Sequence, residues 1–166
     1  SGVKGIRVRN FKNPLLDEDL NINFFSYDSH MIIKAKFEKF SEPLVKNLKN
    51  IQGGSFNDVI PGIIHFTFNN NDYSLLPTIA PSGRFFIVFG DQTNGNESYG
   101  GGRFLYINPP QKNGDIIIDF NKAYNPPCVF STFTTCPIPS KENILPFKVN
   151  AGEKNYNGIL FSSVYQ

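Results

Sequence analysis

The sequence has no tryptophan, one methionine, two cysteines and two histidines in 166 residues. Few histidines and cysteines argue against several kinds of site. A structural zinc ion takes four ligands, and without a Cys-x-x-Cys motif the cysteines would need His30 and His65 from distant strands. A Ser-His-Asp or Cys-His catalytic set is not indicated either. We therefore expect no metal site and no classical nucleophilic hydrolase.

Charge of one sign and long apolar runs are also lacking. Sixteen Lys plus Arg against 14 Asp plus Glu give a net charge of +2, so electrostatics offers no reason to expect nucleic acid or an anionic membrane. The longest unbroken apolar run, Phe85 to Phe89, is far shorter than the roughly 18 residues of a membrane-spanning helix. We expect no nucleic-acid partner and no membrane insertion, and the oligomeric state is left open.

The length and composition match one domain over residues 1–166. A chain of 18.7 kDa with 40% apolar and 18% charged residues can bury its own core. Seventeen Phe and seven Tyr favour strands, because aromatic side chains suit a pleated, half-buried surface. Fourteen Gly and twelve Pro favour many turns. We predict an all-β fold with little helix, organised as a single antiparallel β-barrel or sandwich.

Short apolar segments support this class. The clearest is 33–38, where apolar and charged residues alternate as in a half-buried strand. Residues 64–68 and 73–79, separated by the turn-forming 69–72, predict a hairpin. The further predicted strands are Arg84 to Phe89, Arg103 to Ile107, Asp115 to Phe120 and Phe147 to Ala151.

Two segments have helical signals. Ser41 can cap a helix, Pro43 suits its first turn, and apolar residues at helical offsets precede a glycine pair at 53–54. Periodicity alone therefore favours a short helix in 41–53. A second short helix fits residues 15–20.

Residues 121–146 carry five of the twelve prolines and both cysteines, without a strand or helix period. Loops longer than about 12 to 15 residues without secondary structure are uncommon in compact domains and are usually functional or disordered. The aromatic residues of this loop can pack it against the barrel. Polar side chains that could satisfy its backbone are Asn121, Asn125, Glu142 and Asn143. We predict that this Pro-rich loop covers one side of the barrel.

The same region resembles a known family. Its strings are Asp119 to Cys128, Cys136 to Pro139, Glu142-Asn143 and Ala151 to Lys154, and an earlier block holds Asp91, Thr93, Gly95, Tyr99, Gly100, Gly102, Arg103 and Phe104. These residues look like the signatures of the DUF1684 family, a domain of unknown function, over about 85–154. Lys122 stands where Arg is common and Ser140 where Pro is common.

The resemblance implies positions rather than an activity. It implies an extended conformation for 41–53, which opposes the helical signal there. It leaves the compartment open, since some members are exported and others look cytoplasmic. We take a cytoplasmic protein as the working expectation, with export as the alternative if a signal preceded this sequence.

Cys128 and Cys136 lie eight positions apart on the loop. Three states are open: two reduced thiols buried as small apolar residues, a disulfide, or a metal-binding or reactive thiol. A cytoplasmic location favours the reduced pair, and export favours the disulfide. We assign both cysteines, together with Glu153, a structural role.

Gly100 to Gly102, followed by Arg103, could bring backbone amides and a guanidinium to an anion. The alternative is a tight turn that leads into the Arg103 strand. The string matches neither a Walker loop nor a dinucleotide fingerprint, so no cofactor is expected.

Three hypotheses for function follow. The first is a pocket beneath the loop for a small polar or anionic ligand, with the ligand-binding candidates Tyr99, Arg103, Asn121, Asn125, Glu142 and Asn143. The second is an enzyme that uses Asp119 or Glu142 as general acid or base in that pocket, with Tyr124 as a hydroxyl partner. The third is a structural or interaction module, which predicts an exposed flat apolar patch.

The alternative for the charged residues is a structural role, in which an ion pair holds the loop against the sheet. A buried arginine beside the loop needs a carboxylate, because an unpaired buried charge is costly. We predict that Arg103 pairs with Asp119, Glu142 or Glu153 and fastens the loop to the sheet.

Overall fold

The computed structural model describes residues 21–110 and 114–158. Within these residues the chain forms strands and single-turn 3-10 helices, which confirms the all-β class. The strands are β1 (Ile32–Lys49), β2 (Ser55–Phe68), β3 (Asn71–Leu75), β4 (Thr78–Ile79), β5 (Phe85–Phe89), β6 (Arg103–Ile107) and β7 (Asp115–Asp119). The 3-10 helices are η2 (Ser29–Met31), η4 (Phe120–Lys122), η5 (Pro127–Val129) and η6 (Lys141–Asn143). The helix predicted for 15–20 lies outside the described residues.

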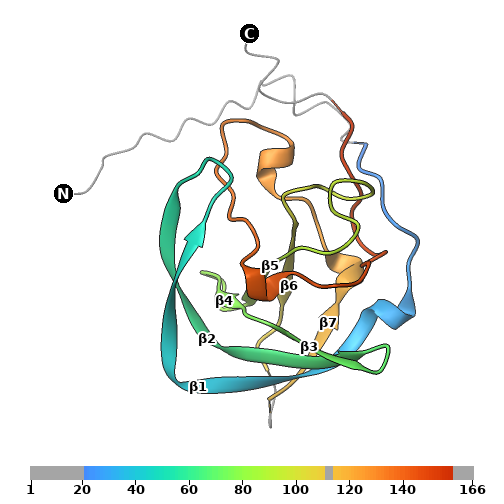
Figure 1. The fold of residues 1–166 in the computed structure, drawn as a ribbon. Helices are drawn as coiled ribbons and strands as arrows, with labels where there is room; N and C mark the ends of the chain where they lie inside the picture. The colour runs from blue at the N-terminus through green and yellow to red at the C-terminus, as the bar shows by residue number, and fades with distance from the viewer. Residues whose placement is uncertain (1–20, 111–113, 159–166) are drawn as a thin grey trace, which may run out of the picture.

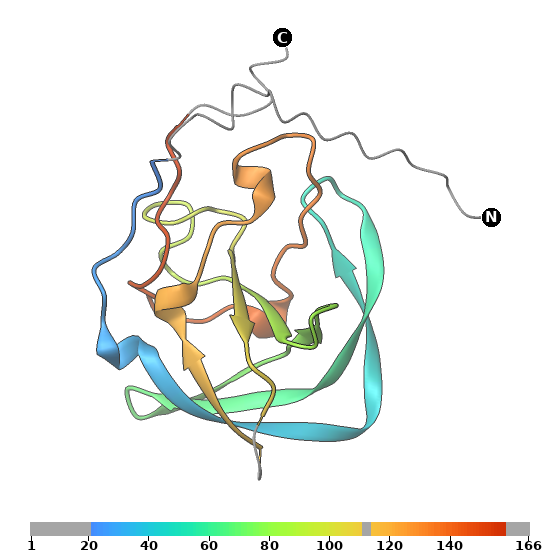
Figure 2. The ribbon, with the colours of Figure 1, turned by 180° about the vertical axis from the view of Figure 1, so that it is seen from behind.

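The strands form two antiparallel sheets that curl into a half-barrel (Figures 1 and 2). One sheet has the order β3-β2-β1-β7 and the other β4-β5-β6. The chain after β7 passes through η4, η5 and η6 and covers one end of the half-barrel. In the described part of the chain, no helix has the length and apolar character to cross a membrane.

The ribbon of β1 and β2 bends sharply in its middle. Lys39 is opposite Gly62 and Leu44 is opposite Ile60, so four residues of β1 face the single residue Pro61. Such a bulge bends a strand, and Gly62 fits there because a side chain would collide with the Glu38 carbonyl oxygen. In Figure 1 the ribbon therefore runs along the bottom of the molecule and then turns up its side. Its outer half, residues 44–60, faces the loop.

The strand alternative for 41–53 is confirmed and the helix is wrong. Residues 44–49 pair with 55–60 of β2, and the glycine pair belongs to the turn between the strands. The predicted hairpin is also present, with a shorter turn and second arm: Asn69 and Asn70, both with positive φ, connect β2 to β3. The second arm ends at Leu75, because residues 78–79 form β4 in the other sheet. The strand predicted for 147–151 is wrong, because this segment joins neither sheet.

The core lies between the two sheets and under the loop. Ile64, Ile87 and Ile118 are fully buried and come from β2, β5 and β7. Phe120, just after β7, packs edge-on against Phe89 at 5.2 Å between ring centroids.

The start of the loop reaches this core through Ala123. Of the loop aromatics, Tyr124 and Phe130 are partly buried but Phe133 is 74% exposed, so the predicted packing of these aromatics against the barrel holds only in part.

Candidate functional site

Arg103 is fully buried and holds the segment after the loop. Its guanidinium contacts the Asp91 carboxylate at 2.8 Å and donates to the backbone carbonyls of Val149, at 2.8 Å, and of Ala151. Asp91 in turn accepts the backbone N–H of Val149 at 3.1 Å. Burial lowers the pKa of Arg103, and Asp91 raises it. The pair thus fixes residues 149–151 against β6 without a strand ladder.

The predicted carboxylate partner of Arg103 was wrong. The ion pair is with Asp91, which sequence reasoning had named only among the residues of the family resemblance. Glu153 offers Arg103 its backbone carbonyl at 3.2 Å rather than its carboxylate. The predicted strands 84–89 and 103–107 held part of the signal. In the structure they pair as β5 and β6 with Phe89 opposite Arg103, and Asp91 follows two residues after Phe89 on the same side.

The glycines before Arg103 form a turn. The Gly102 N–H donates to the Tyr99 carbonyl at 3.1 Å, and Gly102 has a φ of +88°. A Cβ there would lie 2.6 Å from the Phe89 carbonyl oxygen, so glycine is required for the close approach. These contacts favour a tight turn at residues 100–102 over an anion-binding loop.

Asn121 and Asn125 bind backbone groups. The Asn121 amide donates to the Asp28 carbonyl at 2.9 Å and accepts the Asp28 N–H at 3.0 Å, which fixes the chain before η2. The Asn125 amide donates to the Lys154 carbonyl at 2.8 Å. The Glu153 carboxylate accepts the Asn125 N–H at 2.7 Å, and burial raises the pKa of Glu153 against the effect of this bond. These contacts support the structural role predicted for Glu153.

Asp119 and Glu142 lie in different places. Asp119 caps η4 and pairs with Lys122 at 3.0 Å; partial burial opposes the shift, but hydrogen bonds from Lys122 and Asn121 lower the pKa of Asp119. Glu142 is 49% exposed and pairs with Lys46 at 2.6 Å, and this bond lowers the pKa of Glu142 to about 2. Both carboxyls are ionised at neutral pH, so neither is suited to act as a general acid.

The tyrosine candidates are held against other side chains. Tyr124 stacks on Tyr106 with 6.0 Å between the ring centroids. Burial, together with the neighbouring Tyr106 hydroxyl, raises the pKa of Tyr124. The Tyr99 hydroxyl lies 3.9 Å from the Cys128 sulfur, and burial raises the pKa of Tyr99 to about 12. Both hydroxyls therefore stay protonated near neutral pH.

Cys128 and Cys136 are neighbouring free thiols. The Cys128 N–H donates to the Cys136 Sγ at 3.1 Å, and Cys136 is buried. Burial, followed by the hydrogen bond to Cys136, raises the pKa of Cys128 to about 12. Within the described residues, no group of three or more His, Cys, Asp or Glu could hold a metal ion.

We expect both thiols of the native protein to react slowly with iodoacetamide at pH 8, because the reactive species is the thiolate and the raised pKa of Cys128 suppresses it. After unfolding in denaturant, both should be alkylated rapidly. Intact-mass measurement over time follows the reaction. Fast native alkylation, or a native mass lower by two hydrogens, would contradict the picture of two reduced, protected thiols.

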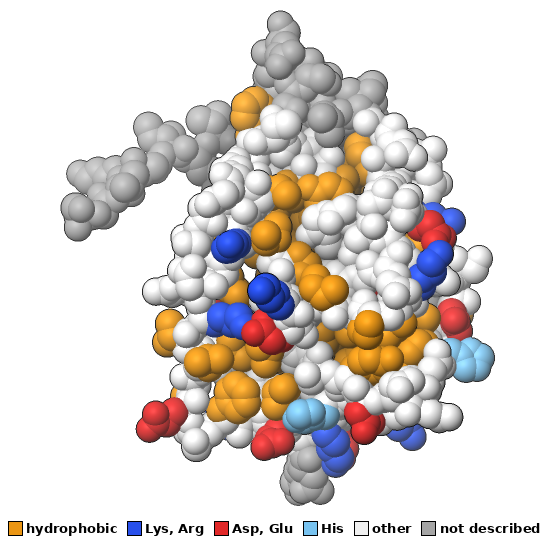
Figure 3. Space-filling view, viewed as in Figure 1, with side chains coloured by type: hydrophobic (Ala, Val, Ile, Leu, Met, Phe, Trp, Pro, Cys, Tyr) orange, Lys and Arg blue, Asp and Glu red, His pale blue; other side chains and the backbone are white. Residues whose placement is uncertain are grey.

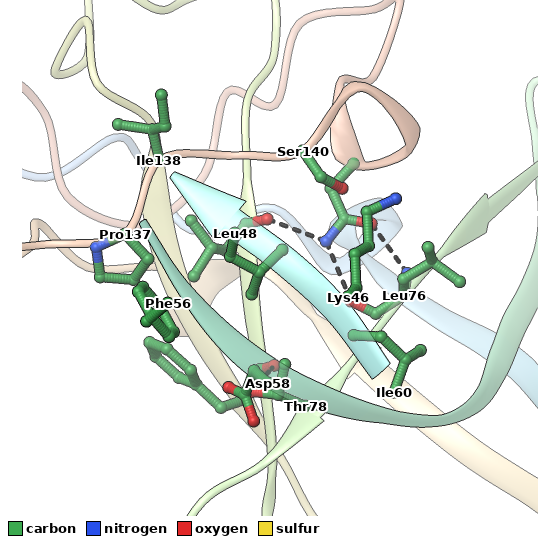
Figure 4. A pocket seen from close by; sticks show the side chains of 13 residues that line it. Lys46, Leu48, Phe56, Asp58, Ile60, Leu76, Thr78, Pro137, Ile138 and Ser140 are labelled. Carbon is green, nitrogen blue, oxygen red and sulfur yellow. Dashed lines mark hydrogen bonds between the residues drawn. The ribbon is translucent and has the colours of Figure 1, made fainter. Parts of the chain in front are cut away.

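The structure has a cavity beneath the C-terminal part of the loop, which we call the loop cavity (Figure 4). Its volume is about 240 Å³. One wall is the outer half of the β1–β2 ribbon, another is β4 and β5, and the third is 137–143. Its lining residues are Lys46, Leu48, Phe56, Asp58, Ile60, Leu76, Thr78, Phe86, Val88, Pro137, Ile138, Ser140 and Asn143.

Backbone bonds hold the loop over this cavity. The Ile51 N–H donates to the Cys136 carbonyl at 3.0 Å, and the Ile138 N–H donates to the Lys49 carbonyl at 3.0 Å. On the inner side, the Asn143 amide accepts the Leu76 N–H at 2.8 Å and donates to the carbonyls of Leu76 and Val88 at 3.0 and 2.9 Å. One side chain of the loop thus joins β5 to the segment between β3 and β4.

The predicted ligand-binding residues are not gathered at this cavity. Of the six, only Asn143 lines it, and Glu142 reaches its edge through Lys46. Sequence reasoning missed the residues of 46–60 because the segment 41–53 was undecided. The available signal was the alternation in β1 and β2, which puts Lys46 and Leu48, and Phe56 and Asp58, on one face.

A larger groove of about 970 Å³ runs between β6 and the pair β1 and β7. Asp119 lines this groove and not the loop cavity. The two acid/base candidates are therefore not in one pocket. Pro109 and Asp115 of this groove flank 111–113, which lie outside the described residues.

Comparisons with known proteins identify the family of this chain. A solution NMR structure of an uncharacterized protein from Haloarcula marismortui is similar to it, with a TM-score of 0.65 and 27% identity, covering 80% of this chain and 75% of that one. No curated protein sequence matches the chain. The family model described as DUF1684, protein of unknown function, matches residues 20–154 and so spans both sheets and the loop. The chain belongs to the DUF1684 family.

Proposed function

We propose that this protein is a binding module that holds a small ligand in the loop cavity. The composition of the cavity walls supports this proposal: eight of the thirteen lining residues are apolar, and five are polar. Small-molecule sites are typically concave and mostly apolar, with a few polar groups that orient the ligand. An apolar cavity of about 150 Å³ can hold benzene, so about 240 Å³ suits a molecule of roughly ten non-hydrogen atoms.

The residues that line the loop cavity favour a different kind of ligand from the one predicted from the sequence. A polar or anionic molecule was predicted on the basis of Arg103, Asn121, Asn125 and Glu142. Arg103 is committed to Asp91, and the asparagines are committed to backbone groups. The walls of the loop cavity instead favour an apolar body with one polar head.

The two other hypotheses have less support. The enzyme alternative needs Asp119 or Glu142 in the pocket, and neither lines the loop cavity. The interaction module predicts one flat apolar patch, whereas on the face shown in Figure 3 the exposed apolar side chains are divided into several patches by polar and charged ones.

Val88→Phe should abolish binding of phenylpropanol, because the larger ring occupies the cavity that Val88 lines. Amide chemical shifts in a ¹H–¹⁵N NMR titration measure this. The wild type should show shifts along 44–60 and 137–143. The matched control is Val59→Phe, which makes the same substitution on the β1–β2 ribbon at a residue that is 44% exposed and does not line the cavity.

Val59→Phe should bind phenylpropanol like the wild type, and thermal melts of both variants show that each is folded. A wild type without shifts in either segment, or equal binding by a folded Val88→Phe, would overturn the proposal.

A further inference from the structure

We infer that the head group recognised in the loop cavity is a cationic amine, which pairs with Asp58. This inference rests on the proposed binding function and names the ligand class. It starts from the charges that line the cavity, of which there are two: the Lys46 ammonium and the Asp58 carboxylate.

The charge of Lys46 is already balanced. Lys46 and Asp58 are opposite each other on β1 and β2, yet the Lys46 ammonium contacts Glu142 at 2.6 Å. In Figure 4 the Lys46 side chain extends toward Ser140, away from Asp58. Glu142, which does not line the cavity, thereby removes the cation that would otherwise neutralise Asp58.

Asp58 has no ion pair among the described residues. Its Oδ1 accepts the N–H of the next residue, Val59, at 2.8 Å, and no other hydrogen bond to its side chain is found in 21–110 and 114–158. Asp58 is a partly buried residue, and most of the other residues that line the cavity are apolar. A carboxylate in such a place gains from a bound ammonium, through a charge-assisted hydrogen bond that water screens only partly.

Two aromatic rings at the cavity also favour a positively charged ligand. Phe56 and Phe86 both line the cavity that Asp58 lines. The face of a phenyl ring attracts a cation. A carboxylate ligand would instead have to draw Lys46 away from Glu142 and lie in a cavity that also contains the Asp58 charge. The apolar walls would hold the body of the amine, so the class is a small primary amine with an aromatic or branched aliphatic body.

Three probes with one body test the head group: phenylpropylamine, phenylpropanol and phenylpropionate. Each is titrated into the wild type at pH 7 and low salt, with binding measured by NMR. We expect the amine to bind about tenfold more tightly than the alcohol, as one charge-assisted bond would give, and the carboxylate to bind more weakly than either.

Asp58→Asn should reduce amine binding about tenfold and leave alcohol binding unchanged. Asparagine keeps an oxygen for the Val59 N–H, so the variant should fold. The matched control is Asp72→Asn, which makes the same change of charge on β3, away from the cavity. It should bind all three probes like the wild type.

The outcomes separate the two claims. If the alcohol binds but the amine has no advantage, or if Asp58→Asn leaves that advantage intact, the amine inference fails and the binding module stands. If phenylpropionate binds best, the head group is anionic and Lys46 is its partner, which also overturns the inference. If no probe binds, both the inference and the proposed function fail.

Discussion

Arg103→Met should lower the melting temperature by on the order of 10 °C. The substitution leaves the Asp91 carboxylate buried without its cation, and breaking a buried pair in this way costs about 3 to 5 kcal/mol. A domain of this size loses about 2 to 4 °C per kcal/mol. The backbone carbonyls of Val149 and Ala151 also lose their donor, so the segment that closes over β6 should loosen first. A thermal melt followed by circular dichroism measures the shift.

The matched control is Glu142→Gln, which breaks the ion pair with Lys46. Because Glu142 is 49% exposed, that pair contributes no more than about 1 kcal/mol, and the melting temperature should change by less than about 4 °C. The pKa of Glu142 is lowered in the folded state, so its contribution is complete above pH 4.5 and is lost as pH falls toward 2. Equal, large effects of both substitutions would show that Glu142 fastens the loop, as the sequence had predicted. Two unchanged variants would contradict the structural role of Arg103.

The sequence predicted the strands where they follow a local pattern. Residues 33–38 alternate because one face of β1 is buried, and the turn at Asn69 and Asn70 is set by backbone conformations that asparagine tolerates. The 41–53 segment could not be assigned in this way. Its helical offsets are overridden by pairing with 55–60, and Pro61 and Gly62 produce the bend that no local pattern reports.

The site was harder to predict than the fold. Polar residues in the loop looked like ligand contacts, but Asn121, Asn125 and Asn143 serve backbone groups, which a long loop without strands must satisfy. The cavity arises where 137–143 meets a ribbon nearly a hundred residues away, with Lys46 and Glu142 separated by 96 positions. Such a meeting depends on the bend in β1 and β2, so sequence spacing gave no sign of it.

Asn143→Ala should destabilise the protein by about 3 kcal/mol, which corresponds to a fall in melting temperature of about 6 to 12 °C. The side chain is buried and makes three hydrogen bonds, to the N–H and C=O of Leu76 and to the C=O of Val88. Each buried backbone group left unpaired costs about 1 to 3 kcal/mol, and the low end applies here because water in the cavity can replace part of the loss. Chemical denaturation measures the free energy of unfolding.

Asn143→Asp distinguishes the hydrogen bonds from simple loss of packing. An aspartate keeps the volume and can still accept the Leu76 N–H, but its carboxylate cannot donate to the carbonyls of Leu76 and Val88. It should destabilise at least as much as alanine at pH 7. Burial beside two carbonyl oxygens raises the pKa of the new carboxyl, so its deficit should shrink as pH falls and the neutral acid regains a donor.

The control for both Asn143 substitutions is Asn47→Ala, which removes an exposed side-chain bond to Asn57 and should change stability by no more than about 0.5 kcal/mol. A deficit for Asn143→Asp that is small, or that does not depend on pH, would mean that the loop is held by its backbone pairing with β1 alone. A large, pH-dependent deficit would show that one amide positions the wall of the loop cavity, and phenylpropanol binding should then weaken in the same variants.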